Sequence, residues 1–210
     1  NTINLKLNKS DSKISDVDIF LEGKNNNINT KKLKKYFNFH EDFVRDQNIK
    51  LDTNSSINFS IDDKLNIKKL AIKSDLNLDS LNINYKSNLI KKYFENYENK
   101  LFIKKPNILL DYSNEKINLR IDGKYSFKNQ TDNFFVKFIG NKNKFELYSL
   151  LGLDKSTLNI SDINYFKKNS IPSKLEILIK KSKNSLNLEK INFIENKNFV
   201  FFKNLNISND

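Results

Sequence analysis

The chain has 210 residues, a formal charge of +12 at neutral pH, 38% hydrophobic residues and no cysteine. This length allows one medium-sized domain with a hydrophobic core, or one segment of a longer array. The lack of cysteine excludes disulfides and thiolate metal sites, and no apolar run reaches the ~18–20 residues that a membrane-spanning helix needs.

In chain order, alternating apolar and polar residues predict strands with one apolar face. These strands are expected at 2–9, 14–22, 57–61, 65–72, 76–85, 107–112, 117–127, 133–139, 158–166, 174–181, 186–194 and 198–207. Apolar residues at helical spacing predict short helices at 31–39, 88–98 and 144–151. The expected fold is therefore mostly β, with antiparallel strands and a few helical insertions.

One eight-residue motif, apolar-x-apolar-x-x-apolar-x-apolar, recurs among these strands. Its copies lie at 65–72, 76–83, 158–165, 186–193 and 200–207. The double polar step breaks the two-residue period, so a regular strand would send the two apolar pairs to opposite faces. A β-bulge at the polar pair restores one face. A two-residue hairpin turn would do the same, but it favours Asn-Gly or Asp-Gly, which these pairs lack. We therefore expect bulges at Lys68-Lys69, Asp79-Ser80 and Glu189-Lys190.

The helical segments suggest an internal repeat. The sequence KKYFNFHE at 34–41 returns as KKYFENYE at 91–98, about 57 residues later, and a weaker copy lies at 144–151. Units that cannot close a core alone gain stability by stacking. We expect one β-groove segment covering 1–210, with possible repeats at 1–43, 44–100 and 101–157 and a final strand group at 158–210. Because the chain begins with Asn1, we also expect an interior segment of a longer protein.

The sequence contains no recognisable catalytic or metal-binding motif. His40 is the only histidine, and its acidic neighbours at the next two positions would not face it on a helix. The four glycines are isolated, so no phosphate-binding loop is present. We expect no enzyme activity, no catalytic residue, no metal and no cofactor.

The positive charge comes almost entirely from lysine, because Arg45 and Arg120 are the only arginines. Recognition of bases and phosphates favours the bidentate arginine side chain, whereas lysine commonly covers solvent-exposed faces and sheet edges. We therefore expect no nucleic-acid partner. A single-stranded nucleic-acid binder that uses Lys and Phe remains a third hypothesis.

Strands that carry the eight-residue motif, interrupted by short helices of the KKYF type, resemble the AsmA-like superfamily. This family comprises bacterial bridge-like lipid-transfer proteins of the AsmA, TamB and YhdP types. The resemblance spans most of the chain, and the run LNLEKINFIENKNFVFFKNLNIS at 186–208 is typical of the YhdP type. It implies an elongated, twisted antiparallel sheet that forms an open groove, apolar inside and polar outside.

The resemblance also implies a non-enzymatic function. The segment would shield phospholipid acyl chains between the inner and outer membranes, at the periplasmic face of the inner membrane. Parts of the chain outside this segment, including an upstream anchor, would contact the membranes. The expected groove-lining residues are Leu65, Ile67, Leu70, Ile72, Leu76, Leu78, Leu81, Ile83, Leu186, Leu188, Ile191 and Phe193. The main alternative is a structural or adhesive β-repeat with a closed core and no ligand.

Overall fold

The computed structural model describes residues 1–9, 15–31, 44–46, 48–94 and 96–207. Most of them lie in long strands. The strands are β1 (Thr2–Lys9), β2 (Ser15–Asn29), β3 (Asn48–Ile61), β4 (Ile67–Leu78), β5 (Ser80–Asn84), β6 (Lys100–Ser113), β7 (Lys116–Phe127), β8 (Gln130–Gly140), β9 (Phe145–Gly152), β10 (Leu158–Ile160), β11 (Tyr165–Lys167), β12 (Ser173–Lys181), β13 (Leu186–Glu195) and β14 (Asn198–Ile207). The helical elements are α2 (Asn88–Tyr93) and the 3-10 turn η1 (Ser161–Ile163).

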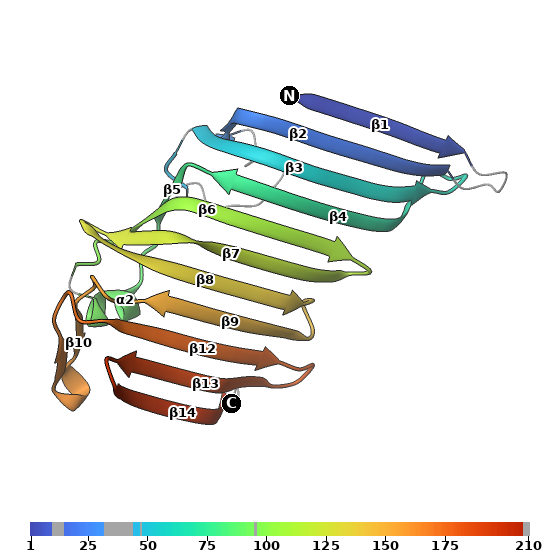
Figure 1. Ribbon diagram of the computed structural model, residues 1–210. Coiled ribbons are helices and arrows are strands. Elements are labelled where there is room, and N and C mark those ends of the chain that lie inside the picture. The colour runs from blue at the N-terminus through green and yellow to red at the C-terminus, as the bar shows by residue number, and fades with distance from the viewer. Residues whose placement is uncertain (10–14, 32–43, 47, 95, 208–210) are drawn as a thin grey trace.

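Twelve of these strands form one antiparallel sheet, in the order β1-β2-β3-β4-β6-β7-β8-β9-β12-β13-β14, with β5 paired to β6. Neighbours in the sheet are mostly neighbours in sequence, so the sheet is a meander. Figure 1 shows that it does not close, with β1 at one edge and β14 at the other. The expected mostly β fold with one open, elongated antiparallel sheet is confirmed.

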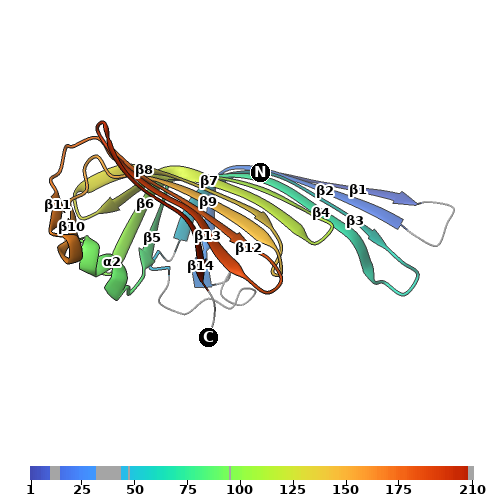
Figure 2. The same cartoon turned by 90° about the horizontal axis from the view of Figure 1, so that it is seen from below.

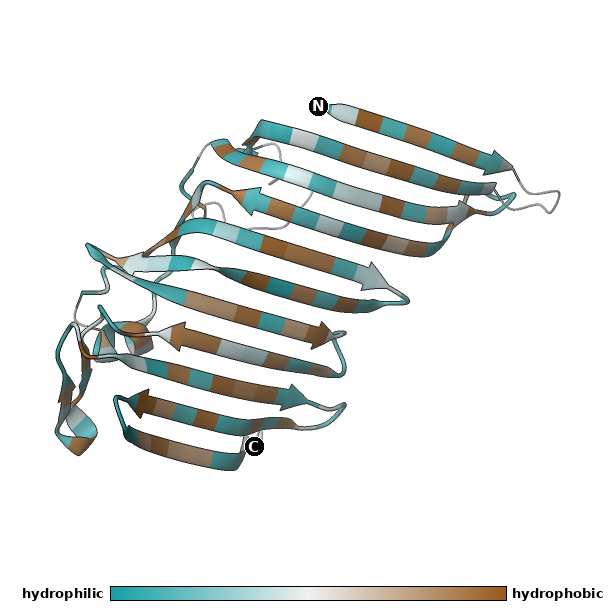
Figure 3. Cartoon of the chain, viewed as in Figure 1, coloured by the Kyte–Doolittle hydropathy of each residue, from teal (hydrophilic) through white to brown (hydrophobic). Residues whose placement is uncertain are grey.

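Strand pairing separates apolar and polar side chains onto the two faces of this sheet. Residues directly opposite each other on antiparallel neighbours point to the same side. Leu110 of β6 lies opposite Leu119 of β7, whereas the adjacent Leu109 lies opposite Arg120. Figure 3 shows the resulting alternation of hydrophobic and hydrophilic positions along the strands.

The expected bulge at Lys68-Lys69 is present. The register between β3 and β4 shifts at this point, and Lys69 adopts a left-handed φ of 50°. Ile67 lies opposite Ile61 before the shift, and Ile72 lies opposite Ile57 after it. Because Ile57 and Ile61 are four residues apart on one strand, Ile67 and Ile72 share a face, as the motif predicts.

A second predicted bulge lies in β13. Leu188 pairs with Ile179, and Lys190 pairs with Leu178, so Glu189 is the extra residue. This extra residue resets the two-residue period, as a bulge does. The apolar residues on both sides of it therefore face the same way.

The third predicted break separates β4 from β5 at Asp79. The Asp79 amide donates to the Lys50 carbonyl at 3.1 Å, and the Asp79 carbonyl accepts from the Lys105 amide at 2.9 Å. Lys105 itself has a φ of 45°, at a register shift between β6 and β7. Breaks on neighbouring strands thus lie side by side, and such breaks bend a sheet. Figure 2 shows the bent sheet, with β5, α2 and β10–β11 on its concave side.

Helix α2 covers part of the concave side. Beneath it lies a small aromatic core of Tyr97, Tyr125 and Phe127, which are 1%, 6% and 7% exposed. The rings of Tyr97 and Tyr125 meet the Phe127 ring edge-on, at centroid distances of 5.2 and 5.3 Å. Phe94, just after the helix, packs on the same ring at 5.3 Å. Edge-to-face pairs of this kind hold the helix end against the sheet.

The structure bears differently on each of the three expected helices. The helix at 88–98 is present but shorter, since α2 ends at Tyr93. The helix at 144–151 is wrong, because this segment forms β9, which pairs with β8 and β12 along its length. Its sequence FELYSLL fits both periods, and two strand partners decide in favour of the strand. Most of the helix expected at 31–39 lies outside the described residues.

The strand expected at 158–166 is also wrong. Leu158 pairs with Lys167 and Ile160 pairs with Tyr165, so this copy of the motif folds into a hairpin, β10–β11. Its connection is η1, which Asn164 ends with a left-handed φ of 51°. Here the polar pair forms a turn instead of a bulge. Asn tolerates the left-handed conformation that such a connection requires.

Candidate functional site

The concave side of the sheet carries a broad apolar surface, here called the concave face. Strand pairing places ten of the expected lining residues on it: Ile67, Ile72, Leu76, Leu78, Leu81, Ile83, Leu186, Leu188, Ile191 and Phe193. Leu70 lies in the bulge between the paired residues Lys68 and Ala71. The ten residues form two groups, one on β4 and β5 and the other on β13. Five strands of the sheet lie between the two groups.

The strands between the two groups supply apolar residues that sequence reasoning did not select. They include Ile108, Leu110, Leu119, Ile121, Phe134, Val136, Phe138, Leu147, Leu151, Leu175, Ile177 and Ile179, linked pairwise across β6, β7, β8, β9 and β12. Their two-residue alternation was visible in the sequence. The selection followed only the eight-residue motif, which marks where strands bend and not which strands line the face.

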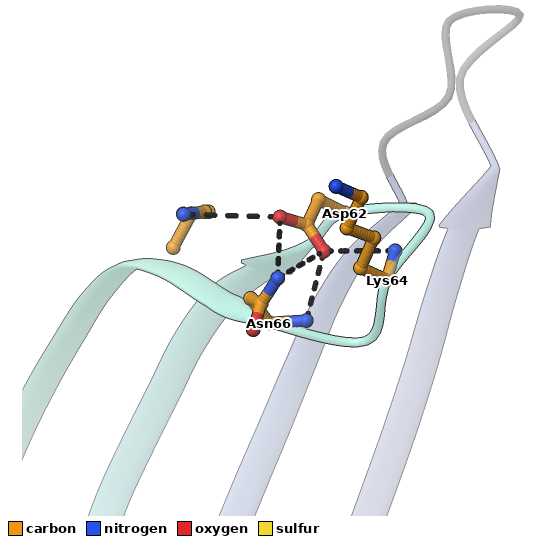
Figure 4. Close-up of polar contacts among 4 residues, drawn as sticks. Asp62, Lys64 and Asn66 are labelled. Carbon is orange, nitrogen blue, oxygen red and sulfur yellow. Dashed lines mark hydrogen bonds and ion pairs between the residues drawn. The ribbon is translucent and has the colours of Figure 1, made fainter.

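Leu65 is the one expected lining residue that lies outside the strands of the sheet. It belongs to the turn between β3 and β4, with a left-handed φ of 63° and 81% of its surface exposed. Figure 4 shows how Asp62 holds this turn: its carboxylate accepts from the amides of Lys64 and Asn66 at 3.0 and 2.8 Å. The hydrogen bond from the Asn66 amide is the largest cause that lowers the pKa of Asp62, and the bond from the Lys64 amide adds to it. The turn takes up the first residues of the motif, so Leu65 projects beyond the sheet.

Much of the concave face has no covering layer among the described residues. At the β1 edge, Ile3, Leu5 and Leu7 are 74%, 60% and 65% exposed. The remaining strand positions are mostly half-buried by their neighbours in the sheet. A contiguous exposed apolar surface is unusual for a monomeric soluble protein and is typical of interaction sites.

The face is not uniformly apolar. Thr53 and Ser55 of β3 lie opposite Leu76 and Ser74 of β4, and the two β3 hydroxyls hydrogen-bond to each other at 3.0 Å. The hydroxyls satisfy one another locally, so they add little polarity to the surface.

The opposite, convex face carries charged side chains that pair with one another, interspersed with exposed apolar residues such as Phe20, Leu109 and Ile139. Glu176 of β12 accepts from Lys190 Nζ at 2.7 Å, from Asn192 Nδ2 at 3.1 Å and from the Tyr148 hydroxyl at 3.3 Å. The hydrogen bond from Lys190 and then that from Asn192 lower the pKa of Glu176. Charges therefore lie on the side away from the apolar surface, which makes the sheet amphipathic.

A buried polar network anchors the segment between β9 and β12, which contains the β10–β11 hairpin. Asp132 of β8, 6% exposed, accepts from the Lys155 amide at 2.8 Å and from the Ser156 hydroxyl at 2.7 Å. Lys167 of β11 is fully buried and donates to the carbonyls of Ser156 and Lys168 at 2.8 and 3.0 Å. Burial lowers the pKa of Lys167, and the negative charge of Asp132 offsets part of this effect by raising it. The hairpin is thus fixed to the sheet by specific bonds.

The described residues contain no cluster of three or more His, Cys, Asp or Glu side chains suited to a metal ion. No helix in the described part of the chain combines the length and apolar character needed to cross a membrane. His40, which was not expected to be catalytic, lies outside the described residues.

No protein-family model, curated protein or solved structure matches this chain.

Proposed function

We propose that the concave face binds phospholipid acyl chains and shields them from water. The observation that carries the proposal is the open, single-layer sheet whose bent inner side is apolar and has no covering layer over most of its described width. Hydrocarbon is the simplest partner for such a surface, since each buried CH₂ group contributes about 0.8 kcal/mol. A bound chain of ordinary length therefore gains on the order of 10 kcal/mol before ordering costs are subtracted.

The charges support binding through chains instead of head groups. Arg120 lies on the convex face, where it pairs with Asp122 at 3.3 Å. No other arginine lies in the described strands of the sheet, and a phosphate-selective site favours that side chain. The proposal therefore includes no selectivity between phospholipid head groups.

The resemblance to the AsmA-like superfamily extends this proposal to a place in the cell. In that reading the segment is one part of a lipid path between the inner and outer membranes of a bacterial envelope, without enzyme activity. The continuous face across β4 to β13 is compatible with a path that runs from strand to strand.

Two adjacent leucines of β6 provide the test. Leu110 lies on the concave face and is half-buried, whereas Leu109 lies on the convex face and is 37% exposed. Leu110→Asp places a carboxylate among the bound chains, and we expect bound phospholipid, measured by native mass spectrometry after purification, to fall about tenfold, or ~1.4 kcal/mol. Leu109→Asp makes the same chemical change on the other face and should leave the bound lipid unchanged.

Two outcomes count against the proposal. A wild-type protein that carries no phospholipid contradicts it directly. Equal lipid loss in both leucine variants would show that the effect comes from stability and not from the face. A lipid-free protein that Leu110→Asp unfolds supports the alternative of a structural β-repeat whose apolar face is packed.

A further inference from the structure

The hairpin β10–β11 and helix α2 partly enclose a cavity of about 530 Å³ over the last strands of the sheet. This volume lies within the range of small-molecule sites, about 300–1,000 Å³. Most of the lining is apolar, with Phe94 and Ile160 above and Leu175 and Phe193 below, and Tyr165 and Glu195 are among its few polar members. It differs from the open face in having walls on both sides.

The cavity roof is held in place by bonds that do not depend on a ligand. The Asp132 network fixes the hairpin to β8, as described above. On the outside, Lys92 of α2 forms an ion pair with Asp162 of η1 at 2.6 Å, which joins helix and hairpin. A site with fixed walls loses little conformational freedom when a ligand binds.

One polar group in the cavity wall lacks a well-formed hydrogen bond. The Tyr165 hydroxyl is buried and makes no hydrogen bond of normal geometry within the described part of the chain, while its ring packs edge-on against Phe193 at 5.8 Å. Burial raises the pKa of Tyr165 to about 12, and the Glu195 carboxylate, which lies near the hydroxyl, acts in the same direction through hydrogen bonding and charge. Leaving a buried hydroxyl unpaired is unfavourable. A ligand that supplies an acceptor or donor here would remove that cost.

The exposed rim indicates how a chain would enter. Ile163, Phe199 and Phe202 are 67%, 72% and 51% exposed, although they line the same cavity. A hydrocarbon chain lying between them would cover these side chains. The carboxylate of Glu195 at the polar end disfavours a fatty acid anion or a phosphate, because like charges repel in a poorly solvated site.

We propose that this cavity binds one uncharged single-chain amphiphile of the monoacylglycerol class. Its acyl chain lies between the hairpin and β12–β14, and a hydroxyl of its head group hydrogen-bonds Tyr165 and Glu195. The inference rests on the proposed function in one respect, since Ile191 and Phe193 also belong to the concave face. Its ligand differs, because phospholipids carry two chains and a charged head group.

The test uses neighbouring residues of β14 and the tyrosine itself. Val200 lines the cavity and pairs with Phe193, whereas Phe201 points to the convex face opposite Asn192. Both are partly exposed, at 49% and 40%, so aspartate at either position is compatible with folding. Binding of 1-monooleoylglycerol is measured by titration calorimetry, with oleate and a two-chain phosphatidylglycerol as comparison ligands.

We expect the wild type to bind one monooleoylglycerol, Val200→Asp to bind at least tenfold more weakly, and Phe201→Asp to bind as the wild type does. Tyr165→Phe should weaken binding about tenfold and raise the melting temperature of the ligand-free protein, because it deletes the unpaired hydroxyl. A purely structural tyrosine would give the opposite shift in stability.

Several results overturn the inference: no binding of monooleoylglycerol, equal weakening by Val200→Asp and Phe201→Asp, unchanged affinity in Tyr165→Phe, or tighter binding of oleate. Leu110→Asp separates this site from the open face. It should lower bound phospholipid about tenfold while leaving monooleoylglycerol affinity intact, so each proposal can fail without the other.

Discussion

Removing the Asp132 carboxylate should release the β10–β11 hairpin from the sheet. Asp132→Ala leaves the Lys155 amide and the Ser156 hydroxyl without their acceptor, and Ser156 is only 1% exposed. A buried polar group without a partner costs about 1–3 kcal/mol. The buried Ser156 hydroxyl, the part-buried Lys155 amide and the lost negative charge near buried Lys167 together predict a loss of roughly 3 kcal/mol in the free energy that keeps the hairpin closed.

Hydrogen exchange followed by mass spectrometry measures this loss where it occurs. A change of ~3 kcal/mol corresponds to amide exchange about a hundredfold faster in residues 153–172. Asp162→Ala is the matched control in the same segment. Its ion pair with Lys92 is solvent-exposed and contributes little to stability, so exchange should change less than about fivefold. Similar exchange in the two variants would refute the assigned role of the network.

Two further predictions concern the backbone and the pH dependence of stability. Lys69→Val should lower the free energy of unfolding by about 1–2 kcal/mol in urea titrations, because Lys69 has a left-handed φ of 50° that β-branched residues resist, whereas Lys69→Gly should not destabilise. An undisturbed Lys69→Val protein would argue against the bulge. Because the pKa of Tyr165 is raised, its hydroxyl stays protonated to a higher pH in the folded state than in the unfolded state. The contribution of Tyr165 to the free energy of unfolding is therefore full below about pH 10 and is lost as the pH rises towards about 12. Tyr165→Phe should therefore lose less stability than the wild type over this interval, and parallel losses would contradict the assignment.

The sequence predicted the sheet well because its information is local. Each strand shows the two-residue period, and the motif itself requires an irregularity at its polar pair. Lys69, Asp79 and Glu189 provide that irregularity at the expected places. The first part of β3 was not predicted, because Thr53 and Ser55 are polar and interrupt the alternation of apolar and polar residues there.

The errors arose where two local solutions were equally possible. At 144–151 the apolar residues satisfy both the helical and the strand period, and pairing with β8 and β12 decides between them. At 158–165 the motif turns back on itself in a segment that is tied to β8 by Asp132, which is distant in sequence. Tertiary contacts of this kind leave no local signal. The enclosed cavity depends on the same contacts and could not be predicted.

The most direct test of lipid binding on the concave face is photocrosslinking in membranes. A phospholipid with a diazirine near the end of one acyl chain is incorporated into vesicles or cells, activated in contact with the protein, and the adducts are mapped by peptide mass spectrometry. Binding through the concave face predicts adducts at residues such as Ile72, Leu110 and Phe138, and few at their convex neighbours Lys73, Leu109 and Lys137. Adducts spread equally over both faces, or none above background, would contradict it.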